Sequence, residues 1–291
     1  MRTNLAMALA VCLSLASMAG HTEDVRKQVV ATTLITGTVQ VTPEGKVHSY
    51  TLDQADKLAP AVRTLLDKNI PVWTFKRSIT LPIDITERMT IRLLAAPVDD
   101  KHDRVSIIAA SFDDDFHTED ARPTSLKRVQ PKYPLMALDA RVQGTVYTLV
   151  LVGRDGKTRK TETEQVNLRS AVPEHDQERM RNDLARAASA ALQDWTWNVP
   201  TTGKYANAPG WYVRVPVRFN LQVRGAPPVK EPGLGEWEVY IPGPRLKRTS
   251  NPLPPELLVP EALAQGSDAI ADGHVQAASS SVELTSPLDG G

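Results

Sequence analysis

The chain has 291 residues, which is long enough for two modest domains with additional segments at the ends. Lysine plus arginine and aspartate plus glutamate each count 34, so the formal net charge is zero. This balance does not predict the grip on phosphates of a basic nucleic-acid-binding protein, so no nucleic acid is expected as a partner. With 41% hydrophobic and 23% charged residues, the composition is typical of a chain with a folded core.

The first twenty residues have the pattern of an export signal. Arg2 supplies a positive charge, Leu5 to Ala16 form an apolar stretch, and Ser17-Met18-Ala19 is a small-x-small cleavage pattern. The apolar run of about 15 residues is shorter than the roughly 20 that a membrane-spanning helix needs. Residues 1–20 are therefore predicted to be a signal peptide that directs the protein to the periplasm. An uncleaved membrane anchor is the alternative.

The single cysteine, Cys12, lies inside this apolar stretch. Val11 stands before it, where a lipoprotein acceptor would need a small residue. A cleaved chain would have no cysteine, so its stability would not depend on disulfides even in an oxidising compartment.

The first folded segment, residues 25–115, begins with a predicted hairpin and helix. Leu34 to Val41 is strand-like, Pro43-Glu44-Gly45-Lys46 is a turn in which glycine accepts a positive φ, and Val47 to Leu52 returns. A short helix with Pro60 in its first turn is predicted from the apolar residues of one face: Leu58, Val62, Leu65 and Leu66.

Strand-like stretches follow this helix. Trp73-Thr74-Phe75 stands at the end of this helix. Met89 to Leu94 and Val105 to Phe112 are expected as two added strands of the same domain. Between Phe75 and Met89, alternation of apolar residues predicts a strand through Ile79, Leu81, Ile83 and Ile85.

Two acidic stretches with one histidine each resemble metal clusters at first sight: Asp99-Asp100-Lys101-His102-Asp103 and Asp113-Asp114-Asp115-Phe116-His117. No two histidines have the i, i+4 spacing of a helical metal site, and both stretches lie in polar connections. Solvated charged loops are therefore expected, with no metal and no cofactor. Residues 116–127 are predicted to be a linker.

Residues 128–224 show the same pattern more clearly. Val142 to Val152 is strand-like, Arg154-Asp155-Gly156-Lys157 is a hairpin turn, and Thr158 to Val166 returns. Trp211 to Val223 alternates strictly, which predicts a half-buried strand with one wet face. Between them a helix is predicted from its apolar face: Met180, Leu184, Ala187, Ala188, Ala191 and Trp195.

The two patterns together predict an α+β fold with two small ββαβ-type domains, of which the first is a diverged copy. Turn glycine to tryptophan takes 28 positions from Gly45 to Trp73 and 39 from Gly156 to Trp195. The additional residues are expected around Val172 to Asp183, as a loop or a longer helix start.

Residues 225–291 form a proline-rich segment, with 10 of the 22 prolines of the chain beyond Gly225. Together with Ser279-Ser280-Ser281, this composition predicts an extended or disordered tail that supplies no core. Trp237, Tyr240 and Ile241 are the exceptions, because large apolar groups in water favour burial against the folded part.

Five stretches occur in an order that resembles the C-terminal domain of TonB, a periplasmic energy-transducing protein: Gln130-Pro131-Lys132-Tyr133-Pro134, Gly144-Thr145-Val146, Arg154-Asp155-Gly156-Lys157, Trp195-Thr196-Trp197-Asn198-Val199-Pro200 and Arg218-Phe219-Asn220-Leu221. That domain is a protein-binding module without catalytic chemistry. The resemblance therefore implies a periplasmic protein that is not an enzyme and that acts in TonB-dependent transport.

In the TonB family the lead-in segment contacts a short peptide of an outer-membrane receptor, which pairs as an added strand. The resemblance implies this partner-binding role for Gln130, Tyr133 and Pro134. The alternative is that Tyr133 only packs the entrance of the domain.

The last predicted strand carries two further expectations. Arg214, Arg218 and Arg224 alternate on its wet face, where they would form a basic stripe for an acidic partner or an ordinary solvated surface. Pro216 has no N–H to donate, which predicts a strand at a sheet edge, where a partner strand can add.

The TonB family normally has a membrane anchor followed by a proline-rich spacer. Here the proline-rich segment follows the domain instead, so a soluble periplasmic relative that binds an envelope protein is preferred. A membrane-anchored transducer or envelope structural protein is the first alternative. A secreted hydrolase or glycan-binding protein with carboxylates that converge only in the fold is the second.

Intact mass of the exported protein tests the predicted signal peptide. We expect the mass of a chain that lacks its first 19 or 20 residues, because Ser17-Met18-Ala19 is the cleavage pattern. A full-length mass in the envelope fraction would contradict cleavage and support the anchored alternative.

Overall fold

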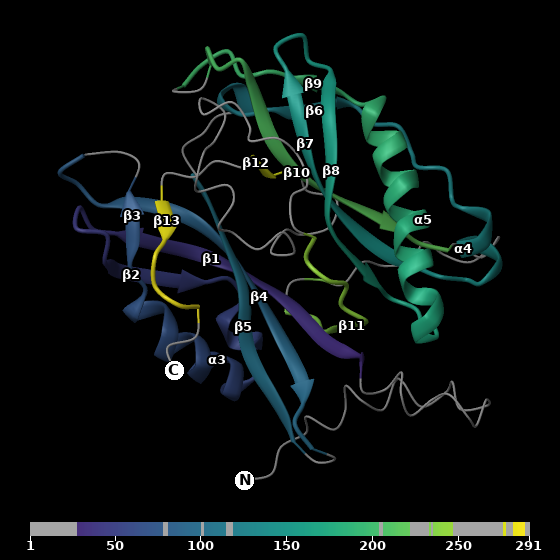
Figure 1. Ribbon diagram of the computed structural model, residues 1–291. Helices are drawn as coiled ribbons and strands as arrows, with labels where there is room; N and C mark the ends of the chain where they lie inside the picture. The colour runs from purple at the N-terminus through teal and green to yellow at the C-terminus, as the bar shows by residue number, and fades with distance from the viewer. Residues whose placement is uncertain are drawn as a thin grey trace.

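The computed structural model describes residues 28–77, 81–99, 102–114, 119–203, 206–221, 233, 235–246, 276–277 and 282–288. These residues form an α+β fold that consists mostly of strands with few helices (Figure 1). The predicted export signal and Cys12 lie outside the described residues.

The first half of the chain builds an antiparallel sheet in the order β2, β1, β4, β5. Its strands are β1 (Val30–Val41), β2 (Val47–Leu52), β4 (Ile85–Pro97) and β5 (Asp103–Asp114). Helix α3 (Pro60–Asn69) has Pro60 in its first turn, as expected, and buries Val62 and Leu66. Trp73 follows the helix, is 1% exposed, and stacks edge-on against Phe75 and Phe112.

One predicted strand of this half is wrong. The alternation through Ile79, Leu81, Ile83 and Ile85 does not form a strand over its described part, since Leu81 and Ile83 are exposed and β4 begins only at Ile85. Pro82 separates these residues and cannot donate to a strand ladder, which explains the late start. Ile79 lies outside the described residues. From Ile85 the strand runs without a break through Met89 to Leu94, which is therefore not a separate strand.

The second half builds a similar sheet in the order β8, β7, β10, β12. Its strands are β7 (Gly144–Gly153), β8 (Thr158–Leu168), β10 (Gly210–Phe219) and β12 (Gln276–Ala277). Helix α5 (Glu174–Gln193) buries Met180, Leu184 and Ala188 against it, and Trp195 follows its end. Most of the additional residues around Val172 to Asp183 are the first turns of α5, so they lengthen the helix.

The two hairpin turns make the same contacts. Gly45 and Gly156 have φ values of +80° and +69°. The backbone N–H of Phe75 donates to the Gly45 carbonyl over 2.7 Å, and that of Trp197 donates to the Gly156 carbonyl over 2.8 Å. A Cβ atom would lie 1.9 Å from the Phe75 oxygen at Gly45 and 2.5 Å from the Trp197 oxygen at Gly156, so both turns require glycine.

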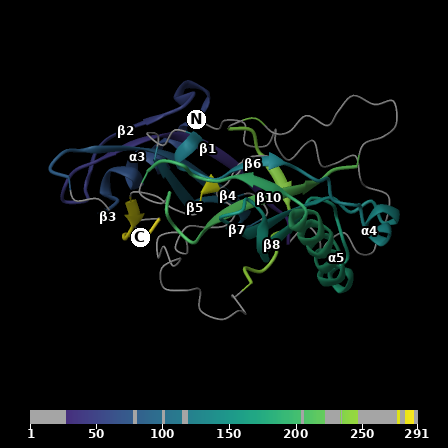
Figure 2. The ribbon, with the colours of Figure 1, turned by 90° about the horizontal axis from the view of Figure 1, so that it is seen from above.

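The two sheets pack against each other through the faces that do not carry a helix. Every residue of β7 except Leu151 is buried, although α5 covers only one face of its sheet. On the other face, Nη2 of Arg92 on β4 lies 3.4 Å from the Tyr147 hydroxyl on β7. The helices α3 and α5 therefore lie on opposite sides of the molecule, with the two sheets between them (Figure 1, Figure 2).

The expectation of an irregular tail is wrong for three short segments, one of which is β12 of the second sheet. Strand β11 (Glu238–Tyr240) pairs with β1 at residues 30–32, and the backbones of Ile241 and Leu168 then exchange hydrogen bonds, so this segment passes from one sheet to the other. Tyr240 and Ile241 are buried, as their apolar character predicts. Strand β13 (Val282–Leu284) pairs with β3 (Phe75–Arg77). The other described residues of the predicted tail (233, 235–237, 241–246 and 285–288) form no further strand, and the remainder of the tail lies outside the described residues.

The predicted linker also contains a strand. Strand β6 (Thr124–Lys127) pairs antiparallel with β9 (Thr196–Asn198), just after Trp195. A four-residue strand of mixed composition carries no periodic signal, so sequence alone did not reveal it.

Replacing Trp195 tests the core of the second half. Its ring is 9% exposed and its Nε1–H donates to the Val129 carbonyl over 2.9 Å. We expect Trp195→Ala to lower the free energy of unfolding by about 3–5 kcal/mol, measured by urea denaturation. Trp195→Phe is the matched control and should cost less, because it keeps an aromatic ring. Unchanged stability in the alanine variant would show that the ring is not part of the core.

Candidate interaction site

The lead-in segment holds Tyr133 against the end of β10. The Tyr133 hydroxyl donates to the Val142 carbonyl over 2.6 Å, and its ring stacks edge-on against Phe219 with centroids 5.5 Å apart. Burial raises the pKa of the Tyr133 hydroxyl to about 12, against the opposing effect of the positive charge of Arg169. Tyr133 therefore packs the entrance of this half, which is the alternative that the sequence left open.

The other predicted residues of this segment are more accessible. Gln130 is exposed, and Pro134 stands directly before helix α4 (Leu135–Asp139). Three large apolar side chains of this short helix are exposed to solvent: Leu135, Met136 and Leu138. Sequence reasoning missed them, although the apolar run after Pro134 was a visible signal.

Arg214 does not lie on a solvated face, so the predicted basic stripe is wrong at this position. Its side chain is 5% exposed and forms a bidentate ion pair with Glu164 of β8, with N–O distances of 2.9 and 3.3 Å. The alternation that points Arg214 away from the helix is as predicted, but the opposing sheet covers that face. The guanidinium is already paired within the chain.

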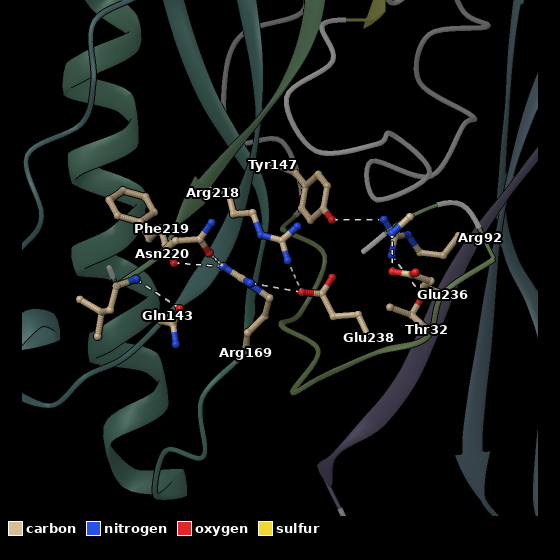
Figure 3. A network of polar contacts seen from close by, with 12 residues as sticks. Thr32, Arg92, Gln143, Tyr147, Arg169, Arg218, Phe219, Asn220, Glu236 and Glu238 are labelled. Carbon is tan, nitrogen blue, oxygen red and sulfur yellow. Dashed lines mark hydrogen bonds and ion pairs between the residues drawn. The ribbon is translucent and has the colours of Figure 1, made fainter. Parts of the chain in front are cut away.

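Arg218 is also buried and paired. Its side chain is 9% exposed and forms an ion pair with Glu238 of β11. Arg169 bonds the same carboxylate over 3.2 Å and also donates to the Phe219 carbonyl and to Asn220 (Figure 3). Glu238 thus joins two guanidinium groups of the second half to a strand of the first sheet. The third predicted arginine, Arg224, lies outside the described residues.

The first sheet carries arginines at the matching positions. Val41 pairs with Ile85 and Val152 pairs with Trp211, and in each sheet an arginine stands three and seven residues further along the second strand. These are Arg88 and Arg92 in β4 and Arg214 and Arg218 in β10.

The matching arginines differ in how exposed their side chains and partners are. Arg88 pairs with Asp53 over 2.8 Å with side chains 43% and 35% exposed, whereas the Arg214–Glu164 pair is buried. Arg92 is 5% exposed and donates to the Thr32 hydroxyl over 3.1 Å, and Glu236 lies beside it (Figure 3). The polar faces of both sheets thus meet in one network.

The outer side of β10 is partly occupied. Strand β12 pairs with Val213 and Arg214, so β10 is not the outermost strand there and the predicted free edge is wrong over these two residues. Among the described residues the pairing does not extend to Pro216, which cannot donate. From Val215 to Phe219, β7 is the strand that pairs with β10 among the described residues.

The predicted partner-binding residues therefore do not form one site. Tyr133 contacts Phe219 on the face of the sheet that α5 covers, whereas Arg214 and Arg218 lie on the opposite face. What the fold does bring together at the end of β10 is Tyr133, Phe219 and the exposed helix α4.

Within the described ranges, no group of three or more histidine, cysteine, aspartate or glutamate side chains is placed to hold a metal ion. His102 bonds Asp99 over 2.8 Å in a solvent-exposed pair. No helix in the described part of the chain is long and apolar enough to span a membrane. No protein-family model matches the chain, and a search of the curated proteins finds no match.

The Arg214–Glu164 pair distinguishes a structural arginine from a binding one. We expect Arg214→Met to lower the free energy of unfolding by about 3–5 kcal/mol, because Glu164, whose side chain is 14% exposed, loses the bidentate guanidinium that offsets its desolvation. Adding Glu164→Met should recover much of this loss. Arg88→Met at the exposed matching pair should cost at most about 1 kcal/mol. Urea denaturation of the four proteins measures these values, and an unaffected Arg214→Met would return this residue to the candidate binding surface.

Proposed function

We propose that the chain is an exported periplasmic protein-interaction module of two small ββαβ-type domains. In this proposal the second domain resembles the C-terminal domain of TonB and has no catalytic role. It binds an extended segment of an envelope protein, such as the periplasm-facing peptide of an outer-membrane receptor, by strand addition. The binding edge is the outer side of β10 from Val215 to Phe219.

The observation that carries this proposal is that the outer side of β10 already accepts an extended segment. In the described part of the chain, β12 joins β10 through two residue pairs, at Val213 and Arg214. Such a short strand contributes few backbone hydrogen bonds, so a longer peptide that enters beside Val215 gains more pairing than it displaces. Pro216 limits the pairing that indiscriminate partners can achieve.

Exposed apolar side chains near the end of β10 support the same location. Tyr133 packs on Phe219, the last residue of β10, and α4 begins two residues after Tyr133. Leu135 is 75% exposed there, the largest exposed fraction among the large apolar residues that the structure describes. Apolar side chains beside a strand edge provide contacts that give an added strand its specificity.

In this function the buried arginines hold the edge in place. Arg214 ties β10 to β8, and Arg218 ties it to β11, so the strand is rigid before a partner arrives. A preformed edge reduces the ordering cost that an incoming peptide must offset.

Competition with the tail tests this proposal. Fluorescently labelled peptides from the periplasm-facing N-termini of outer-membrane receptors serve as probes, and anisotropy measures their affinity. We expect binding to slow amide exchange in residues 215–219. Ala277→Pro, which weakens β12, should tighten binding, and Tyr133→Ala should weaken it.

Ala262→Pro is the matched control, because it places a proline in the same tail outside β12, and it should leave the affinity unchanged. Tyr133→Phe keeps the packing on Phe219 and should bind nearly as well as the unchanged protein. If peptides bind with no protection of residues 215–219, or if Ala277→Pro has no effect on affinity, the β10 edge is not the site.

A further inference from the structure

The last described residues of the chain, Val282–Leu288, lie along the first half rather than the second. Strand β13 pairs antiparallel with β3, with Val282 opposite Arg77 and Leu284 opposite Phe75 (Figure 1). Val282 is 0% exposed and belongs to the core cluster around Trp73. This C-terminal segment is therefore part of the core of a domain that begins about 250 residues earlier.

Specific hydrogen bonds fix the position of this segment. The Nε1–H of Trp73 donates to the Leu288 carbonyl over 3.1 Å. The backbone N–H of Thr285 donates to the Thr74 carbonyl over 2.8 Å, and that of Thr74 donates to the Ser286 hydroxyl over 3.1 Å. The contacts involve mainly backbone groups and small hydroxyls, which is how an extended peptide binds to a short strand.

In the second half, β9 corresponds to β3. The strand that pairs with β9 is β6, which comes from the segment just before this half. Ser125 of β6 lies opposite Trp197, and Trp195 donates its Nε1–H to the Val129 carbonyl. That carbonyl is four residues after Ser125 (129 − 125 = 4).

The C-terminal segment repeats this spacing. Leu284 lies opposite Phe75, and the carbonyl that accepts from Trp73 is that of Leu288, again four residues later (288 − 284 = 4). Phe75 and Trp197 each stand two residues after the tryptophan and each bond the hairpin glycine. Residues 282–288 thus take the place in the first half that residues 123–129 take in the second.

We propose that the groove along β3 and Trp73 is a peptide-acceptor site whose occupant is the C-terminal segment Val282–Leu288 of this chain. Among its described residues the first half has no lead-in strand of its own, and the C-terminal segment takes that place through non-covalent contacts. The same segment binds in trans when it is offered as a separate peptide. This site is distinct from the β10 edge, so a result against the proposed function does not count against this site.

The contacts define the kind of peptide that the groove takes. Its first position is a small apolar residue that is fully buried, as Val282 is, and its third and seventh are apolar residues that pack on the same core, as Leu284 and Leu288 do. The second position faces Lys76 across the strands, and glutamate is found there. Opposite charges across an antiparallel pair favour this register over one that is shifted by a residue.

A nicked protein tests whether the segment is a separable ligand. A specific protease sequence is inserted between Thr249 and Ser250 of the full chain, and the protein is cleaved after it has folded. We expect the fragment from residue 250 to co-elute with the remainder in gel filtration. Without its covalent link the segment loses its high effective concentration, so an excess of labelled peptide 280–291 should exchange with it. This peptide lacks β12, so its binding reports on β3 alone.

Two peptide variants and one spectroscopic signal test whether the peptide occupies the groove. Peptide with Val282→Asp should bind at least about tenfold more weakly, because it places a charge in the core, whereas Glu283→Gln should retain most of the affinity. The indole N–H resonance of Trp73, assigned with Trp73→Phe, should shift when the site empties and return when peptide 280–291 binds. The proposal would be overturned if the fragment is lost on cleavage while this resonance and the melting temperature stay unchanged. Equal binding of the Val282→Asp peptide and the unchanged peptide would also overturn it.

Discussion

The carboxylate of Glu238 is shared by two guanidinium groups, and the arrangement of the two sheets depends on it. Arg169 and Arg218 reach it from the second sheet, while its own strand, β11, belongs to the first. Desolvating three charged groups costs several kcal/mol each, and their mutual attraction offsets this only with good geometry and additional acceptors. Asn220 and the Phe219 carbonyl supply these acceptors to Arg169.

A polar contact of this kind sets a register between the sheets that an apolar one would not. Two flat apolar faces can slide past each other at small cost, whereas a displaced Arg218 would leave a buried charge unpaired. The segment after β11 then continues to Leu168 of β8, so backbone hydrogen bonds reinforce the same alignment. The two halves therefore form one body, although each has its own core.

Local signals in the sequence predicted the elements of the fold well. The hairpin turns at Gly45 and Gly156, the helix with Pro60 in its first turn, and the alternation from Trp211 onward depend on neighbouring residues, and local physics decides them. The alternation also placed Arg214 correctly, on the face away from α5. The alternation could not distinguish a strand face exposed to water from one packed on the polar face of another sheet, because polar side chains are favoured on both.

The structures of the tail and of the candidate site depend on contacts between residues that are far apart in the sequence, and local patterns do not reveal such contacts. Val282 stands in a segment whose composition suggested disorder, yet a strand of three residues needs no periodic pattern when it pairs with the edge of another strand. For the same reason β12 was not foreseen beside β10. The packing of Tyr133 depends on the Val142 carbonyl, nine residues later, whose position no local pattern reveals.

The bond between Trp73 and Leu288 has a consequence for the order in which the molecule is made. The two residues are separated by 215 positions, so the domain that leaves the ribosome first is the last to obtain all its strands. Truncation of the chain before Val282 would remove a strand from the amino-terminal half while leaving every described strand of the second half encoded.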